Sequence, residues 1–212
     1  MALVPLVLRD GNNAAQNQEM FQGLAGAGNN IPVVSLDTTR NTYRASAANA
    51  AVITTTTKTI LNIQGSATKT VRIQRIGFTI SAATAAQCTV QLQRTSTQGA
   101  GGTAVAPTVA KLDTNAAAAT AVVQHFTTGA QAQGTGVGGP ITSISFSQQV
   151  TTTAPTFLGD QHMLWAFPEN GMLGGQALVL RGTADFIELQ TFTAIGTTPA
   201  LSYMVEWIED NS

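Results

Sequence analysis

Short apolar runs that alternate with polar residues recur from residue 52 to the end of the chain, and they constrain the fold more than any other feature. Alternation with a period of two places the apolar side chains on one face of a β-strand. Gly- and Pro-rich segments such as GTGVGGP and FPENG separate the runs. We expect about nine strands, at residues 52–63, 71–80, 87–93, 122–126, 141–146, 163–167, 177–180, 186–192 and 201–207.

No amphipathic helix longer than two turns is evident beside these runs, which favours an all-β fold. About eight to ten short strands in one domain are typical of a jelly-roll-like β-sandwich, whereas an immunoglobulin-like sandwich is smaller. One strand changes its alternation, because Val71 and Ile73 have one parity and Ile76, Phe78 and Ile80 the other. This slip predicts a bulge or bend at positions 74–75.

The first 50 residues differ in composition from the rest. Asn, Gly and Ala dominate them, and the apolar patch at 3–8 is short. Such a segment cannot form a core of its own. We therefore expect an extended N-terminal arm at residues 1–50 and the β-sandwich at residues 51–212. The opening sequence MALVPLVLRD lacks the basic start of a signal peptide, so we expect synthesis in a cytoplasm without export.

Charge excludes several functions. Charged residues make up only 10% of the chain and the pI is about 6.1, so nucleic-acid binding is not expected. No apolar run reaches the roughly 18 residues of a membrane helix.

Residues 1–111 carry a net charge of +6 and residues 112–212 a net charge of −7. Two interpretations stay open: complementary patches that dock subunits, or two halves whose charges mix within one sandwich.

Two charged groups bear on this choice. A basic group could meet acidic residues of a neighbouring subunit, or phosphate, and it consists of Lys69, Arg72, Arg75 and Arg94. An acidic group lies at the end of the sequence, and it consists of Glu206, Glu209 and Asp210. A solvated tail is the favoured interpretation of this group, and a partner of the basic half is the alternative.

Residues suited to catalysis are scarce. His125 and His162 are the only histidines, and neither belongs to a motif with metal-ligand spacing. The remaining metal hypothesis combines them with Asp160, but structural histidines are the favoured interpretation. Cys88 shares its parity with apolar neighbours and should face the core, where a thiol is inert. We therefore expect no catalytic residue, no cofactor-binding residue, no metal ligand, no cofactor and no enzymatic activity.

Two further patterns have a structural and a functional interpretation. Gly134, Gly136 and Gly139 match GxGxxG, but Pro140 and a strand follow where a dinucleotide site needs a helix, so we expect a flexible loop. Aromatic residues concentrate in the last 60 positions. Core packing is the favoured interpretation, and sugar stacking would require Trp165 or Trp207 to be exposed.

Three stretches carry a resemblance to a known group of proteins. They read IQRIGFTISAATAAQCTVQLQRTSTQGAGGT, KLDTNAAAATAVVQHFTTG and FLGDQHMLWAFPENGMLGGQALVLRGT. Together with the charge-poor β domain and the arm, they resemble the jelly-roll virion proteins that decorate, or cement, the heads of tailed bacteriophages.

The resemblance implies a structural protein of the virion that binds the outside of the capsid and stabilises the shell. Its partners would be further copies of itself, with a trimer favoured, and the major capsid protein, while no membrane is involved. Residues 1–50 would be the docking arm. The alternatives are a phage tail component (a tube, terminator or fibre-linked module) and a carbohydrate-binding module.

Overall fold

The computed structural model describes residues 7–9, 15–17, 41–51, 58–84, 87–127, 132–147, 149–150, 163–167, 178–193 and 198–211. The chain divides into two compact units, Met1–Arg40 and Asn41–Ser212. In the first unit β1 (Val7–Arg9) pairs with β2 (Ala15–Asn17) in antiparallel fashion. In the parts of the chain that the structure describes, no helix is long and apolar enough to cross a membrane.

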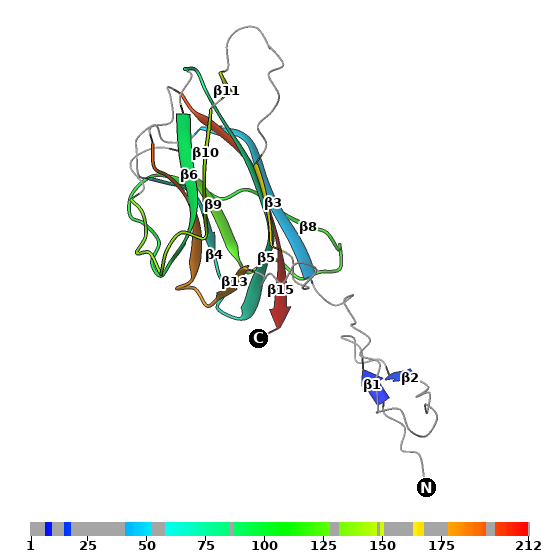
Figure 1. Ribbon diagram of the computed structural model, residues 1–212. Coiled ribbons are helices and arrows are strands. Elements are labelled where there is room, and N and C mark those ends of the chain that lie inside the picture. Colours follow the sequence, from blue (N-terminus) through cyan, green and yellow to red (C-terminus); the bar gives the residue numbers. More distant parts are fainter. Residues whose placement is uncertain are drawn as a thin grey trace, which may run out of the picture. The chain divides into compact units, whose positions relative to one another are not determined.

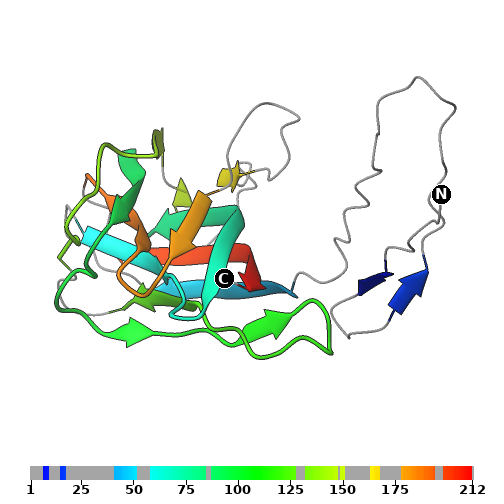
Figure 2. The ribbon, with the colours of Figure 1, turned by 90° about the horizontal axis from the view of Figure 1, so that it is seen from below.

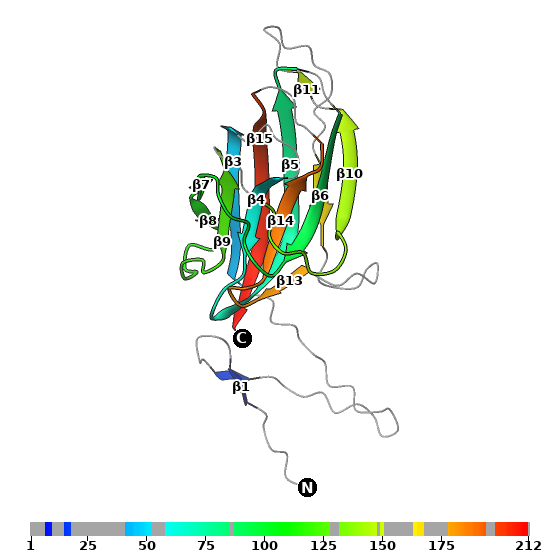
Figure 3. The ribbon, with the colours of Figure 1, turned by 90° about the vertical axis from the view of Figure 1, so that its left-hand side faces the viewer.

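The second unit is built from two sheets. The six-stranded sheet has the order β10-β6-β14-β4-β9-β7. The seven-stranded sheet has the order β11-β5-β15-β3-β8, and β12 and β13 also pair with β5. Figure 1 shows the sheets as two layers, and Figure 3 shows β15 and β14 within them. The strands are β3 (Asn41–Ala51), β4 (Lys58–Gln64), β5 (Lys69–Ala82), β6 (Gln87–Thr95), β7 (Ala104–Val105), β8 (Val109–Lys111), β9 (Val122–Phe126), β10 (Thr142–Ser147), β11 (Gln149–Val150), β12 (Met163–Ala166), β13 (Leu178–Arg181), β14 (Phe186–Thr191) and β15 (Ala200–Asn211).

The strand order is that of a jelly roll. Strands β3, β4, β5 and β6 alternate between the two sheets. Later in the chain, β14 inserts between β4 and β6 in the six-stranded sheet, and β15 inserts between β3 and β5 in the seven-stranded sheet. The predicted jelly-roll-like β-sandwich is therefore confirmed. The segment between β6 and β10 carries three extra strands, which extend both sheets beyond β4 and β3; the stretch with β7 and β8 is green in Figure 2.

The apolar side chains that alternate along the strands meet between the sheets. Trp207 stacks on Tyr43 with ring centroids 5.8 Å apart, and both rings are buried. Cys88, whose inward orientation the sequence predicts, is buried in the same core. The predicted bulge in β5 is also confirmed, because Glu206 pairs with Arg75 and Trp207 with Ile73, which leaves the intervening residue without a counterpart.

The predicted boundary at residue 50 is wrong. Strand β3, which begins at Asn41, lies between β15 and β8, so the sandwich begins ten residues earlier than expected. Its core-facing residues include Ala45 and Ala47, whose small side chains give a weak apolar pattern. The predicted strand at 52–63 is confirmed from Lys58 on, and residues 52–57 lie outside the described residues.

Candidate functional site

A pocket of about 430 Å³ opens between the two sheets, where β6 and the start of β10 face β12 and β13. Its size is within the range of small-molecule sites. Two arginines, one aspartate and four apolar residues line it. The lining residues are Arg94, Ile141, Phe167, Leu178, Val179, Arg181 and Asp185.

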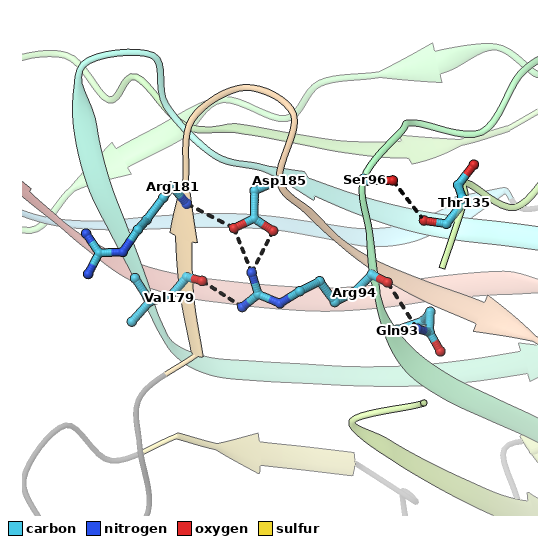
Figure 4. Close-up of polar contacts among 7 residues, drawn as sticks. All are labelled: Gln93, Arg94, Ser96, Thr135, Val179, Arg181 and Asp185. Atoms are coloured by element: carbon cyan, nitrogen blue, oxygen red, sulfur yellow. Dashed lines mark hydrogen bonds and ion pairs between the residues drawn. The ribbon is translucent and has the colours of Figure 1, made fainter. Parts of the chain in front are cut away.

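Arg94 is fixed at the wall of this pocket (Figure 4). Its Nη1 lies 2.6 Å from each carboxylate oxygen of Asp185, and its Nη2 donates to the carbonyl of Val179 at 2.7 Å. The side chains of Arg94 and Asp185 are 29% and 19% exposed, so solvent still reaches the pair. Because Arg94 is on β6 and Val179 is on β13, the bond to Val179 joins the two sheets at this edge of the sandwich.

Arg181 supplies the second guanidinium, and it is oriented differently. Its backbone N–H donates to Asp185 at 3.0 Å, while the side chain extends away from that carboxylate (Figure 4). The Arg181 Nη1 lies 3.4 Å from the hydroxyl of Thr70. The turn that follows uses Gly182 at a φ of +81°, a conformation that glycine adopts without strain. Asp185 thus neutralises Arg94, whereas the guanidinium of Arg181 lies over β5 beside Thr70.

A second carboxylate, that of Glu188 on β14, is completely buried. Its Oε2 accepts hydrogen bonds from the Thr59 hydroxyl and the Gln190 amide, both at 2.8 Å, and from the Gly134 N–H at 3.1 Å. Its Oε1 accepts from the Gly99 N–H at 3.3 Å. These bonds fasten two loops onto the outward face of the six-stranded sheet, so Glu188 acts as a clamp.

Glu209 on β15 is a clamp of the same kind. It accepts hydrogen bonds from the Thr120 N–H and hydroxyl, from the Ala121 N–H, and from the indole N–H of Trp207 at 3.0 Å. The segment before β9 is thereby tied to the end of β15. The favoured interpretation of residues 206–210 as a solvated tail is wrong, because they belong to a paired strand and Glu209 is buried.

The two charged halves meet within the chain. Three ion pairs between described residues each join a cation from 1–111 to an anion from 112–212. They are Arg44–Glu206 at 2.6 Å, Arg72–Asp210 at 2.5 Å and Arg94–Asp185 at 2.6 Å. The sandwich therefore mixes the charges of its halves, and for Arg72 and Arg94 the acidic partner lies in the same chain rather than in a neighbouring subunit.

The sequence allowed two interpretations of the histidines, a structural role or a metal site. His125 is buried between the sheets, where its Nδ1 lies 3.0 Å from the Tyr203 hydroxyl on the opposite sheet. Burial lowers the pKa of His125 and raises the pKa of Tyr203 to about 12, so neither group is charged at neutral pH. His125 therefore has the structural role that the sequence favours. The other two members of the metal hypothesis, His162 and Asp160, lie outside the described residues. Within the described ranges no three His, Cys, Asp or Glu side chains are placed to hold a metal ion.

The remaining predictions concern a thiol, a loop and the aromatic residues. Burial raises the pKa of Cys88 to about 11, which keeps it protonated and unreactive. Gly136 bridges to Thr95 and a strand follows, so the GxGxxG match is a loop. Trp207 is buried, and Trp165 is half-buried with its ring 4.9 Å from that of Phe78, so core packing holds for both.

The pocket itself was not anticipated from the sequence. Arg94 and Asp185 are 91 positions apart, and Arg181 lies alone among acidic residues. The only local signal is the RGTAD segment, in which a glycine turn brings the carboxylate back to the arginine backbone. A comparison with protein-family models, with curated proteins and with solved structures finds no match for this chain.

Proposed function

We propose that this chain is a structural protein of a tailed-phage virion, which binds the outside of the capsid as a homo-oligomer and stabilises the shell. A trimer is the favoured state, the major capsid protein is the partner, and synthesis takes place in the host cytoplasm. The observation that carries this proposal is the use of the interior carboxylates as clamps. Glu188 and Glu209 hold loops and strand ends in place through four hydrogen bonds or more each.

Carboxylates of this kind serve rigidity and not chemistry. A general acid or base needs an accessible oxygen within hydrogen-bond reach of a substrate. The oxygens of Glu188 instead accept bonds from their own chain in a fully buried position. A sandwich with its loops fastened in this way suits a shell component, which must keep its surface in one shape.

The division of the chain also supports a docking role. Residues 1–40 form a unit separate from the sandwich. A terminal segment that becomes ordered on a partner can cover a large surface, and several copies in one oligomer raise the effective concentration of each contact. We therefore assign residues 1–40, rather than 1–50, as the arm that contacts the capsid.

The test is re-addition of the purified chain to phage particles that lack it, after its mass has been measured by light scattering. We expect a trimer that binds saturably and raises the temperature at which the particles release DNA. A chain lacking residues 1–40 should still melt cooperatively but bind weakly, because the whole sandwich remains. A hexameric ring that ignores capsids would support the tail alternative, and failure of every oligomer to bind particles would refute the proposal.

The pocket favours the second candidate, a carbohydrate-binding function, because it combines charged side chains with an apolar wall. The two functions are compatible, since a protein on the outside of a particle can also contact a host surface.

A further inference from the structure

We propose that the outward face of the seven-stranded sheet docks against an acidic surface of another protein. This face is formed by β12, β13, β5, β15 and β3, and Figure 3 shows β3, β15 and β5 side by side. We call it the arginine face, and its charged side chains are those of Arg44, Arg72, Arg75, Arg181, Glu206 and Asp210.

One row of charges crosses three strands of this face. Arg75 on β5 is opposite Glu206 on β15, and Glu206 is opposite Arg44 on β3. The Oε2 of Glu206 lies 2.6 Å from the Nη2 of Arg44, so this carboxylate is bound to Arg44. Arg75 is exposed, and within the described residues its side chain makes no hydrogen bond or ion pair. The guanidinium of Arg75 is therefore available to a partner.

The guanidinium of Arg181 joins this face from β13. Its Nη1 lies 3.4 Å from the hydroxyl of Thr70 on β5, while the preceding Leu180 is buried in the core. Successive side chains of a strand point to opposite sides of the sheet, so Arg181 extends over the outward face. Thr70 is neutral, and no carboxylate among the described residues binds the Arg181 side chain. This guanidinium is also available to a partner.

The charges of the arginine face do not cancel. Its four arginines are accompanied by two carboxylates, which gives the face a net charge of +2, whereas the whole chain has a net charge of −1. The carboxylates bind Arg44 and Arg72, so the excess charge belongs to Arg75 and Arg181. A guanidinium binds a carboxylate through two parallel hydrogen bonds. The complementary partner is therefore a surface that presents Asp and Glu side chains.

Apolar side chains beside the charged row favour a protein over a phosphate polymer. Leu164, Gly77 and Met204 form the neighbouring row, in which Leu164 is 52% exposed and Met204 is half-buried. Arginine and methionine are enriched at protein interfaces. Nucleic acids bind mainly through their phosphates, which gain nothing from Leu164 and are repelled by a carboxylate such as that of Glu206.

The dimensions of the face suit one standard interface. Strand β15 has 12 residues and is about 40 Å long, and four neighbouring strands are together about 20 Å wide. The resulting area is about the 800 Å² that one partner contributes to a stable complex. Two copies of the face would bring positive charge against positive charge, so a second copy is not the favoured occupant. We assign the face to an acidic surface of the major capsid protein, an identity that rests on the proposed function.

The experiment measures the binding of the full chain to phage particles that lack it. Arg75→Glu and Arg181→Glu should each weaken binding about fivefold or more, because each reverses a charge that faces the partner. Lys111→Glu is the matched control. Lys111 is exposed on β8 but is opposite the buried Tyr43, so the same charge change lies off the arginine face and should alter binding less than about twofold.

Two further variants test the chemistry of the partner. Glu206→Gln removes a negative charge from the face and should strengthen binding about twofold, a gain that a purely structural role would not produce. Leu164→Ser should weaken binding about threefold without changing its dependence on salt, because only apolar contact is lost. A melting curve for each variant ensures that binding is compared only between folded proteins.

The outcomes separate this inference from the capsid role. Wild-type binding that both arginine variants retain in full, or that Lys111→Glu weakens equally, would overturn the docking face and leave the capsid role intact. Failure of the wild-type chain to bind particles would refute both. A smaller oligomer for Arg75→Glu, measured by light scattering, would overturn the inference by showing that the face joins copies of this chain. Saturable binding of a short single-stranded DNA that Arg75→Glu abolishes would overturn it in favour of phosphate.

Discussion

The outward faces of the two sheets differ in what lies on them. On the six-stranded sheet the outward side chains of β14, Glu188 and Gln190, are buried, and two glycine loops bond to Glu188. On the seven-stranded sheet the outward Arg44 and Glu206 pair with each other across strands, and Leu164 is 52% exposed. A polar residue that faces away from a core is thus not necessarily a surface residue, because a distant loop can bury it.

The largest expected effect is on stability, and it compares a carboxylate on the outward face of each sheet. Glu188→Ala removes a buried carboxylate that accepts hydrogen bonds from two backbone N–H groups, a hydroxyl and an amide. We expect a loss of about 4 kcal/mol in the free energy of unfolding, measured in urea. Glu206→Ala removes only the partner of an arginine that is 42% exposed, so its loss should stay below about 1 kcal/mol. Similar losses for the two variants would contradict the comparison.

The loop over the six-stranded sheet offers a second test. A Cβ on Gly134 would lie 1.9 Å from the carbonyl oxygen of Thr97 and 3.0 Å from Oε1 of Glu188. Gly134→Ala must displace the loop, at a cost of about 2 kcal/mol. Gly139→Ala is the control in the same loop, since a Cβ there meets nothing within 4 Å, and it should change stability by less than about 0.5 kcal/mol. Denaturation curves that rank the two variants in the opposite order would show that the loop is not held against the sheet.

A third prediction concerns His125, which is buried between the two sheets. Burial lowers the pKa of His125 in the folded protein, so the unfolded chain takes up a proton first as the pH falls. The contribution of His125 to the free energy of unfolding is therefore fully present above the unfolded histidine pKa of about 6.5. It declines as the pH falls below that value, by at most about 1.4 kcal/mol per pH unit. His125→Gln should flatten the decline between about pH 7 and 5.5, relative to the wild-type protein. If the free energy of unfolding depended on pH in the same way in the two proteins, His125 would be excluded as the source of the decline.

The smallest effect belongs to the seven-stranded face. Leu164→Ser changes a side chain that is half exposed on β12, so the free energy of unfolding should stay within about 0.5 kcal/mol of the wild type. Leu189→Ser, in the buried core, is the contrasting variant and should lose several times more. A loss above about 1 kcal/mol for Leu164→Ser would contradict the assignment of this leucine to an exposed face.

Alternation was sufficient to predict the core strands. The runs around Cys88, Leu189 and Tyr203 each present apolar side chains at every second position, and each forms a strand with those residues buried. The bulge in β5 was also predictable, because a change of parity within one strand has few other physical causes.

The missed features depend on contacts between distant residues. Strand β3 was assigned to the arm because its core positions are filled by Ala45 and Ala47, which resemble loop residues in composition. The alternation of Ile187, Glu188 and Leu189 is typical of a strand whose carboxylate faces away from the core, but nothing in it indicates the loop that buries Glu188. The pocket depends on pairing β12 and β13 with β5, which no local pattern specifies.

The position of β15 has a consequence for the order in which the protein folds. This strand, residues 200–211, separates β3 from β5 and pairs with both along most of its length. A growing chain on the ribosome cannot complete the seven-stranded sheet until residue 211 has been made. For most of translation, the edges of β3 and β5 that pair with β15 in the finished sheet therefore have no partner strand. Unpaired edges invite association with other chains. The rate at which β15 arrives, rather than the stability of the finished sandwich, should then decide how much of the protein escapes aggregation during synthesis.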